Sequence, residues 1–188
     1  MSPVYKPAED SLLLLRQVKA LVQGAVLDMG TGSGIQAIAA AQKPEVSRVL
    51  AVDINPEAVE TARQNAEEAK VSHKISIVLG DLFSGIDHKC FNWILFNPPY
   101  LPSEGAADEV SWVGGARGCE IIERFLSEVA NHLDPDGAIL MVYSTLTGLQ
   151  LDRFSDVYII EVLDETKLFL EKLFCVLLRL RYPFFMPK

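Results

Sequence analysis

The 188-residue sequence has few cysteines, no long apolar run and no signal pattern. Its three cysteines, Cys90, Cys119 and Cys175, lie far apart and form no Cys-x-x-Cys pair. We therefore expect neither a zinc site nor a disulfide framework, and a reducing, cytoplasmic compartment fits this usage best. The most apolar stretch, residues 168–180, is interrupted by charged side chains, and residues 1–10 lack a basic-then-apolar start. No membrane-spanning segment is expected.

Basic residues are also too few for a typical nucleic-acid binder. The chain has 17 Lys and Arg residues against 25 Asp and Glu residues, and its formal net charge of −8 would repel a phosphate backbone. The charge therefore argues against nucleic acid as a partner. A content of 49% hydrophobic and 22% charged residues is that of an ordinary globular protein, and the length fits one domain, residues 1–188.

Apolar segments alternate with helix-like segments along the chain. Pro7 and the acids after it predict the first turn of a helix that continues to residue 22, and Pro135-Asp136-Gly137 predicts a turn. The further helices are expected at 35–42, 56–68 and 120–133, and the strands at 25–27, 48–52, 74–79, 91–96, 138–143, 157–163 and 173–180. Residues 164–171 have some helical character. This alternation predicts an α/β fold with a mostly parallel, doubly wound sheet.

A glycine cluster follows the first expected strand. After Asp28, glycine occupies every second position at Gly30, Gly32 and Gly34. Glycines permit positive φ and close approach of a ligand, and the following helix start supplies free N–H groups, so a nucleotide-like ligand is favoured over a turn without a ligand. The third glycine of a Gly-x-Gly-x-x-Gly dinucleotide fingerprint would fall on Ile35, which weakens a nicotinamide interpretation.

Acidic residues follow the next two expected strands. Asp53 ends the second strand, where its carboxylate can accept hydrogen bonds from both hydroxyls of a ribose. Helix capping is the alternative, but Asn55 already offers that cap. Asp81 follows the third strand and can accept from the exocyclic amine of adenine, although a glycine–aspartate pair alone is more often a turn.

The strongest signal is the segment Asn97-Pro98-Pro99-Tyr100 at the end of the fourth expected strand. Two prolines remove backbone donors, so Asn97 and the Pro98 carbonyl can accept both N–H bonds of a planar nitrogen as it pyramidalises toward a methyl group. The flat face of Tyr100 would align that nitrogen for in-line transfer from a sulfonium, without a general base. A stiff loop or a proline-rich docking segment is the alternative.

Together these segments resemble the HemK/PrmC-like N5-glutamine methyltransferases, a family of class I Rossmann-like methyltransferases. The resemblance is carried by residues 4–10, 28–34, 53–58, 80–82, 97–100 and 112–115 with Gly118. It implies a single domain with a seven-stranded, mostly parallel sheet, a C-terminal antiparallel hairpin and helices on both faces. Residues 1–22 would form a cofactor-closing segment and helix, and residues 23–188 the Rossmann-like core.

The resemblance also implies the cofactor, S-adenosyl-L-methionine, and its site, without a metal. The residues it places at the cofactor are Pro7, Ser11, Asp28, Gly30, Gly32, Gly34, Asp53, Ile54, Asp81, Leu82 and Asn97. Glu9 and Asp10 belong to the same closing segment as Pro7 and Ser11. The catalytic residues it implies, at the acceptor, are Asn97, Pro98 and Tyr100.

Substrate and partner are likewise implied by resemblance. The chain shows no counterpart of the N-terminal helical domain of bacterial members, so it resembles the short archaeal and eukaryotic branch. In that branch the substrate is the glutamine of the Gly-Gly-Gln motif in a class I translation termination (release) factor. A small zinc-binding activator subunit that adds a strand to an exposed sheet edge is also implied, and residues 74–79 are a plausible edge.

Three functions remain open at this point. The first is protein-glutamine methylation, with lysine as another possible protein acceptor. The second is N6-adenine methylation of DNA or RNA, which the acidic charge and short length disfavour. The third is a non-enzymatic scaffold that binds S-adenosylmethionine. Trp112 and Arg117 belong to a long connection that either forms a lid or substrate groove or only packs and is solvated.

Overall fold

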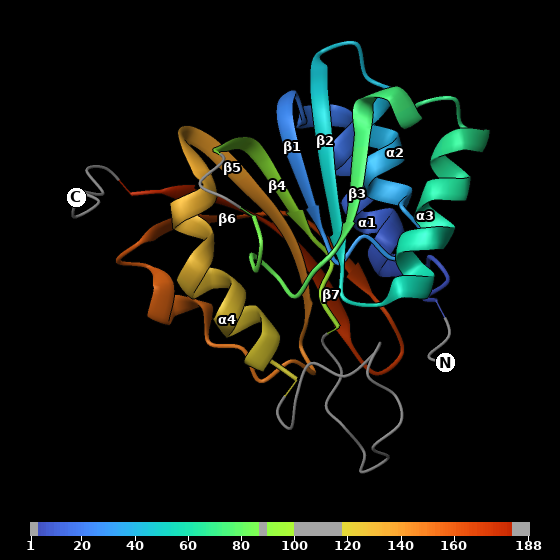
Figure 1. Cartoon of the computed structure of the whole chain (residues 1–188). Helices are drawn as coiled ribbons and strands as arrows, with labels where there is room; N and C mark the ends of the chain where they lie inside the picture. Colours follow the sequence, from blue (N-terminus) through green and yellow to red (C-terminus); the bar gives the residue numbers. More distant parts are fainter. Residues whose placement is uncertain (1–3, 87–89, 100–117, 182–188) are drawn as a thin grey trace.

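The computed structural model describes residues 4–86, 90–99 and 118–181, and these form a seven-stranded sheet in the order β3-β2-β1-β4-β5-β7-β6 (Figure 1). Strands β1 to β5 run parallel, and β7 is antiparallel to both of its neighbours, β5 and β6. The strands are β1 (Gly24–Met29), β2 (Val46–Asp53), β3 (Ile75–Leu79), β4 (Phe91–Phe96), β5 (Leu133–Ser144), β6 (Tyr158–Lys167) and β7 (Lys172–Leu180). The expected α/β fold with a C-terminal antiparallel hairpin is confirmed.

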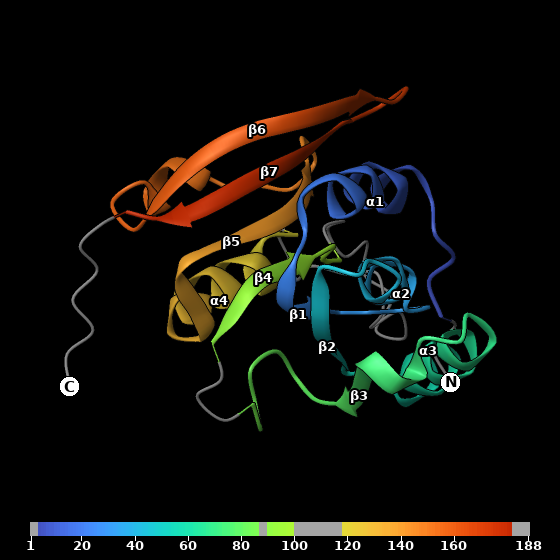
Figure 2. The same ribbon diagram turned by 90° about the horizontal axis from the view of Figure 1, so that it is seen from above.

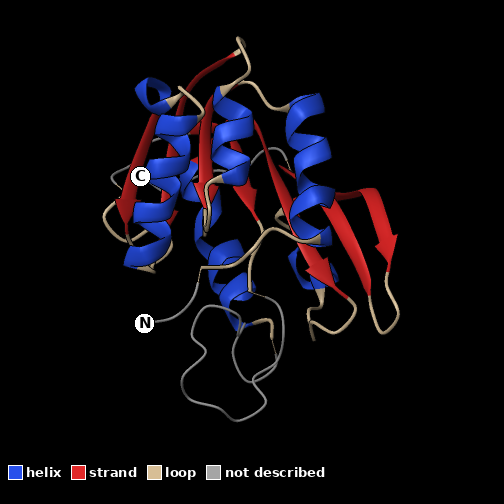
Figure 3. Ribbon diagram, turned by 90° about the vertical axis from the view of Figure 1, so that its right-hand side faces the viewer, coloured by secondary structure: helices blue, strands red, loops and turns tan. Residues whose placement is uncertain are grey.

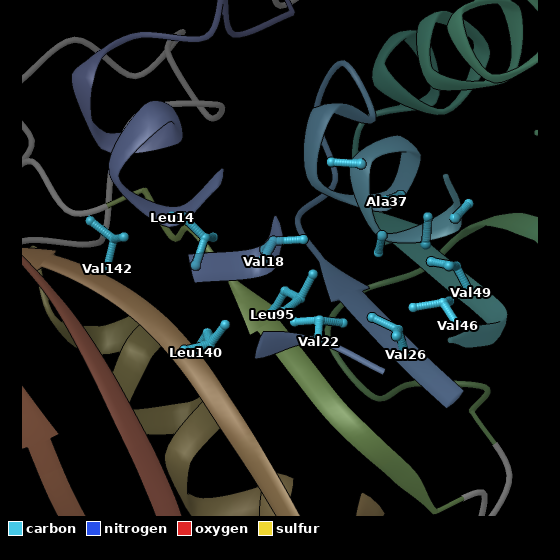
Figure 4. Close-up of a cluster of buried hydrophobic side chains, with 14 of the residues drawn as sticks. Leu14, Val18, Val22, Val26, Ala37, Val46, Val49, Leu95, Leu140 and Val142 are labelled. Atoms are coloured by element: carbon cyan, nitrogen blue, oxygen red, sulfur yellow. The ribbon is translucent and has the colours of Figure 1, made fainter. Parts of the chain in front are cut away.

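Helices cover both faces of the sheet, as Figures 2 and 3 show. The helices are α1 (Glu9–Leu21), α2 (Ile35–Ala41), α3 (Pro56–Glu68) and α4 (Glu120–Glu128). Alternate residues of the central strands enter two apolar clusters, one shared with α1 and α2 and the other with α4. Figure 4 shows the first cluster, in which Leu14 and Val18 of α1 lie over Leu140 and Leu95 of the sheet. Burial on both faces explains why these strands read as continuous apolar runs.

Local sequence accounts for the helix starts near the site. The Asn55 side chain accepts from Glu57 N at 3.0 Å, and Pro56 occupies the first turn, so α3 begins as predicted. The first helix differs slightly from expectation, because Pro7 lies outside it and Ala8 is the capping residue. Within the described residues no helix is long and apolar enough to cross a membrane.

The expected helix 120–133 is too long. Helix α4 ends at Glu128, and a 3-10 turn, Val129–His132, leads directly into β5. The predicted turn at residues 135–137 lies inside β5, where the pairing with β4 jumps from Phe91↔Leu133 to Trp93↔Ala138. The turn-forming residues are present, but they form an insertion within β5, and β5 pairs with β4 both before and after that insertion.

The helical character expected at residues 164–171 is wrong. Strand β6 continues to Lys167 and pairs with β7 as far as Lys167↔Lys172. The Glu, Lys and Leu residues of this stretch favour helix locally, but cross-strand pairing with β7 overrides that preference. The region therefore forms a long hairpin whose strand β6 is one edge of the sheet, while β3 is the other edge, as predicted for residues 74–79.

Candidate functional site

The candidate site lies where the parallel strands end, at the lower edge of the sheet in Figure 1. The glycine loop after β1 and the acid at the end of β2 meet directly, because Gly32 N donates to Asp53 Oδ2 at 2.8 Å. Thr31 N also donates to Val52 O at 3.0 Å. Strand β1 lies between β2 and β4, so the loops after all three strands share one end of the sheet.

Two glycines of the loop serve different purposes. Gly32 has φ +55°, and a Cβ built on it would meet nothing within 4 Å. Gly34 has φ +82°, but a Cβ there would lie 3.1 Å from Ala62 Cβ in α3. Gly34 is therefore required by packing, whereas the space at Gly32 leaves the backbone open to close approach by a ligand. Gly30 also has positive φ and lies at the solvent side of the loop.

Asp28 is buried at the start of the loop. Its Oδ2 accepts from Thr31 Oγ1 at 2.6 Å and from Ala37 N at 3.1 Å, so the carboxyl group ties the loop to the first turn of α2. Burial raises the pKa of the Asp28 carboxyl to about 7, against the two hydrogen bonds that lower it. A positive charge bound beside this group would favour its ionised form. Contact between Asp28 and the cofactor remains a prediction.

Asp53 presents both carboxylate oxygens to the same space. Oδ1 accepts from Asn55 N at 2.9 Å and Oδ2 accepts from Gly32 N, which fixes the group and leaves lone pairs on each oxygen. Such a fixed pair of acceptors could hold the two hydroxyls of a ribose. Beside it Ile54 is 58% exposed, so an apolar side chain is available to cover a flat ring.

Asp81 and Leu82 follow β3 on the adjacent side of this space. Asp81 Oδ2 accepts from Arg124 Nη2 of α4 at 3.0 Å, an ion pair that sequence reasoning did not anticipate. The pair engages one carboxylate oxygen and leaves the other as an acceptor. Leu82 is buried and has φ +49°, a backbone conformation that is costly for leucine and is often found near functional sites.

Asn97 is held in one orientation by the first turn of α1. Its Nδ2 lies 3.0 Å from Asp10 Oδ2 and 3.3 Å from Ser11 Oγ. Because a carboxylate can only accept, the amide nitrogen must face Asp10 and the amide oxygen must face away from it. Asn97 Oδ1 is buried and has no hydrogen-bond partner among the described residues. A bound ligand with an N–H or O–H group could therefore donate to this oxygen.

Asp10 is itself fixed by hydrogen bonds. Its Oδ1 accepts from Tyr5 Oη at 2.7 Å and from Ser11 N at 2.6 Å. The first turn of α1 is tied to α2 as well, because Gln36 Nε2 donates to Ser11 O at 2.8 Å. Pro98, next to Asn97, is buried. Tyr100, Trp112 and Arg117, with the glycines 114 and 115, lie outside the described residues.

Sequence reasoning assigned the acids at positions 9 and 10 to the helix dipole and to a closing segment. It therefore missed the direct bond from Asn97 to Asp10, whose only signal was a second acid in the first turn of a helix that begins far away in the chain. Pro7 is exposed two residues before α1, and no described contact gives it a role in the site. Within the described residues no group of His, Cys, Asp and Glu side chains could hold a metal ion.

Comparison with known proteins identifies the class. The model of the methyltransferase small domain matches residues 7–169, and the chain therefore belongs to this family of methyltransferases. The chain is 41% identical over 150 residues to MJ0928 of Methanocaldococcus jannaschii, named as a protein N5-glutamine methyltransferase, covering 77% of this chain and 74% of that protein. It is 34% identical over 155 residues to the human methyltransferase HEMK2, and the match covers 75% of this chain and 72% of that protein. The resemblance to the HemK/PrmC-like N5-glutamine methyltransferases is confirmed.

A solved structure supports the fold. The Mtq2–Trm112 complex of E. cuniculi, described as responsible for methylation of the eRF1 translation termination factor, contains a chain that superposes with a TM-score of 0.73 at 24% identity. The match covers 95% of this chain and 99% of that chain. The two folds therefore agree over nearly the whole of each chain.

Proposed function

We propose that the chain transfers a methyl group from S-adenosylmethionine to the side-chain amide nitrogen of a protein glutamine, in the Gly-Gly-Gln motif of a class I translation termination factor. The observation that carries the proposal is the buried, unpaired Oδ1 of Asn97, fixed by the bond from Nδ2 to Asp10. A primary amide offers two N–H donors and is planar, which is what this acceptor and the neighbouring Pro98 carbonyl would recognise.

The residues present fit the cofactor. The open space at Gly32, the fixed acceptor oxygens of Asp53 and the exposed side chain of Ile54 would take the sugar and its neighbours, and the free oxygen of Asp81 would take the adenine amine. When bound, S-adenosylmethionine would supply the electrophilic methyl group. Transfer would break its sulfur–methyl bond, form a nitrogen–methyl bond on the glutamine amide and release one amide proton to solvent.

The chain's own contribution is alignment of a poor nucleophile. An amide lone pair is delocalised into the carbonyl, so the nitrogen must pyramidalise before it can attack. Acceptors fixed in place on both N–H bonds stabilise that geometry and cost little reorganisation at the moment of transfer. Asn97 Oδ1 would accept one N–H and the Pro98 carbonyl the other.

The experiment that tests this function is methyl transfer to a termination factor. The chain is incubated with labelled S-adenosylmethionine and the factor carrying either Gly-Gly-Gln or Gly-Gly-Ala, and the label is located by mass spectrometry. Label on the glutamine alone is the expected result. Label that survives the alanine change, or that goes instead to lysine or to nucleic acid, contradicts the glutamine assignment.

Asn97→Ala separates acceptor binding from cofactor binding. We expect the rate of transfer at saturating cofactor to fall by about a hundredfold, as for loss of one fixed transition-state hydrogen bond, while the Kd for S-adenosylmethionine changes by less than about threefold. Titration calorimetry measures the Kd on the same preparation. Equal losses of binding and of rate would show that Asn97 acts on the cofactor.

We further propose that a small zinc-binding activator pairs with the exposed edge of β3, and the likeness to the Mtq2–Trm112 complex supports a small partner subunit. Gly80 N donates inward to Asp53 O, whereas Ile77 O faces outward and is covered by Arg63 Nη2 at 3.1 Å. Ile77→Pro would remove an outward donor while leaving the inward ladder intact. Co-purification with the activator should be lost in Ile77→Pro and kept in Arg63→Ala, and retention in both would exclude this edge.

A further inference from the structure

The tip of the β6–β7 hairpin presents two apolar side chains to solvent. Between the paired residues Lys167 and Lys172, Phe169 is 99% exposed and Leu170 is 79% exposed. Leu168, by contrast, packs against the core cluster beneath α1. Hairpin turns usually carry glycine, asparagine, aspartate or proline, so two adjacent large apolar residues at this turn have no local structural reason.

The tip is rigidly held. Leu168 N donates to Glu171 O at 2.8 Å across the turn, and Thr145 N donates to Lys172 O at 2.9 Å from the loop after β5. Lys172 N donates to Thr145 Oγ1 at 3.0 Å, and Ser144 Oγ donates to the Glu171 carboxylate. A hairpin braced in this way loses little conformational entropy when a partner covers it.

The tip lies at the same end of the sheet as the acceptor site. Strand β6 runs in the direction of β5, so its last residue lies at the carboxyl end of the parallel strands. Figure 2 shows α1 alongside the hairpin, and Arg16 of α1 binds Asp164 of β6 at 3.0 Å. One turn before Arg16, Leu12 is 49% exposed and follows Ser11, whose hydroxyl lies beside Asn97.

Four exposed apolar side chains therefore belong to the hairpin tip, to the loop after β5 that contacts the tip, and to the first turn of α1 next to Ser11. We name this set the docking rim, and it consists of Leu12, Leu146, Phe169 and Leu170, with exposed fractions of 49%, 44%, 99% and 79%. Leu146 belongs to the loop after β5, directly after Thr145, which bonds to Lys172 at the base of the tip. Its backbone N donates to Ser144 Oγ at 3.0 Å. Charged residues at the tip, among them Glu165 and Lys167, surround the apolar side chains, as in the polar rim of a protein interface.

We propose that the docking rim binds the body of the acceptor protein, a folded protein that projects its glutamine loop to Asn97. This inference rests on the proposed function and names the surface that selects the substrate. Strand register places Phe96 level with Met141 and Val176, so the tip projects roughly 20 Å beyond that level at about 3.3 Å per residue. A single glutamine side chain cannot contact both Asn97 and the hairpin tip. A folded protein that delivers its glutamine to Asn97, however, presents the rest of its surface to this end of the sheet.

The test compares the double variant Phe169→Ser/Leu170→Ser with Ile159→Ser. Ile159 is 53% exposed at the opposite end of the same strand, so it is a matched apolar control. Transfer from labelled S-adenosylmethionine to the intact termination factor gives KM and kcat for each variant. We expect the double variant to raise KM at least tenfold, about 1.4 kcal/mol, with kcat and the cofactor Kd unchanged, and the control to match the parent chain.

The outcomes distinguish this inference from the function on which it rests. An unchanged KM in the double variant, or a fall in kcat alone, overturns the docking rim while the parent chain still methylates the factor. Absence of transfer by the parent chain overturns the proposed function, and the docking inference with it. A dimer in sedimentation that only the double variant abolishes would assign the tip to a second copy of this chain and would also overturn the inference.

Discussion

Replacing Asp10 with asparagine is expected to reverse the side-chain amide of Asn97 while leaving the surrounding fold in place. In the parent chain the Asp10 carboxylate accepts from Asn97 Nδ2 at 3.0 Å, and Asn97 Oδ1 is left for the acceptor. The backbone N–H of Ser11, 2.6 Å from Asp10 Oδ1, is a fixed donor. It would hold the oxygen of the new amide, so the new NH₂ group would face Asn97. Two NH₂ groups cannot bind one another, and Asn97 would turn its oxygen inward.

The size of the effect follows from the bond that sets the orientation. A hydrogen bond to a charged group contributes about 1.5–3 kcal/mol, and each 1.36 kcal/mol is a factor of ten in rate. In the parent chain the productive orientation is therefore favoured by roughly tenfold to 150-fold. Because Asp10→Asn inverts the preference, kcat for methyl transfer should fall by about that range, with the cofactor Kd within about threefold of the parent value.

The assay is steady-state transfer of label at saturating cofactor and acceptor, with the cofactor Kd and the melting temperature measured on the same samples. Ser11→Ala is the matched control, because it removes two 3.3 Å contacts, from Asn97 Nδ2 to Ser11 Oγ and from Ser11 Oγ to Asp10 Oδ1, and leaves the bond from Asn97 to the Asp10 carboxylate in place. It should lower kcat by less than about fivefold. A kcat for Asp10→Asn within twofold of the parent chain would refute the reasoning that Asp10 orients Asn97.

Three further predictions concern the proposed cofactor site. Burial raises the pKa of Asp28 to about 7, so between about pH 4 and pH 7 the native state holds a proton that the unfolded state has lost. The free energy of unfolding should therefore fall as pH rises from about 4 to 7. Asp28→Asn should flatten that slope, measured by urea unfolding at several pH values. Gly34→Ala would place a Cβ 3.1 Å from Ala62 of α3 and should lower the free energy of unfolding by about 1–3 kcal/mol. Gly32→Ala should lower the free energy of unfolding by less than Gly34→Ala but weaken cofactor binding by a larger factor. The reverse order would contradict the division of roles between the two glycines. Arg124→Ala should raise the cofactor Kd by a few-fold, because Asp81 loses the partner that holds its carboxylate in place. The free energy of unfolding should stay within about 0.5 kcal/mol of the parent value, since the ion pair is exposed. A larger loss of stability would contradict the assignment of this ion pair to the cofactor site.

Much of the fold follows from local pattern. Residues 25–68 were predicted to form a strand, a glycine loop, a helix, a second strand and a capped helix, and the structure confirms each element. Fully buried parallel strands and capped helices both have strong local signals. The edge position of β3 was also predicted correctly. The site residues after β1, β2 and β4 lie at one end of the sheet because parallel strands end together.

The errors occur where tertiary pairing overrides local preference. Residues 164–167 favour helix by composition, yet they pair with β7, and the Arg16–Asp164 ion pair binds them to a helix 148 positions away. The residues at 135–137 have turn chemistry, yet β4 and β5 pair on both sides of them. The bond from Asn97 to Asp10 also spans the chain, over 87 positions, and no local pattern could reveal it.

That bond makes the acceptor geometry depend on a helix end. Helix ends are among the first parts of a protein to open, because local opening requires far less free energy than global unfolding. The first turn of α1 is held to the rest of the chain by the Gln36–Ser11 bond and by Asn97 itself. If that turn frays, Asn97 loses its orientation while the sheet and its core remain folded. Methyl transfer should then be lost on heating at a temperature below the melting transition, with the order of the first helical turn acting as the thermal limit of the enzyme.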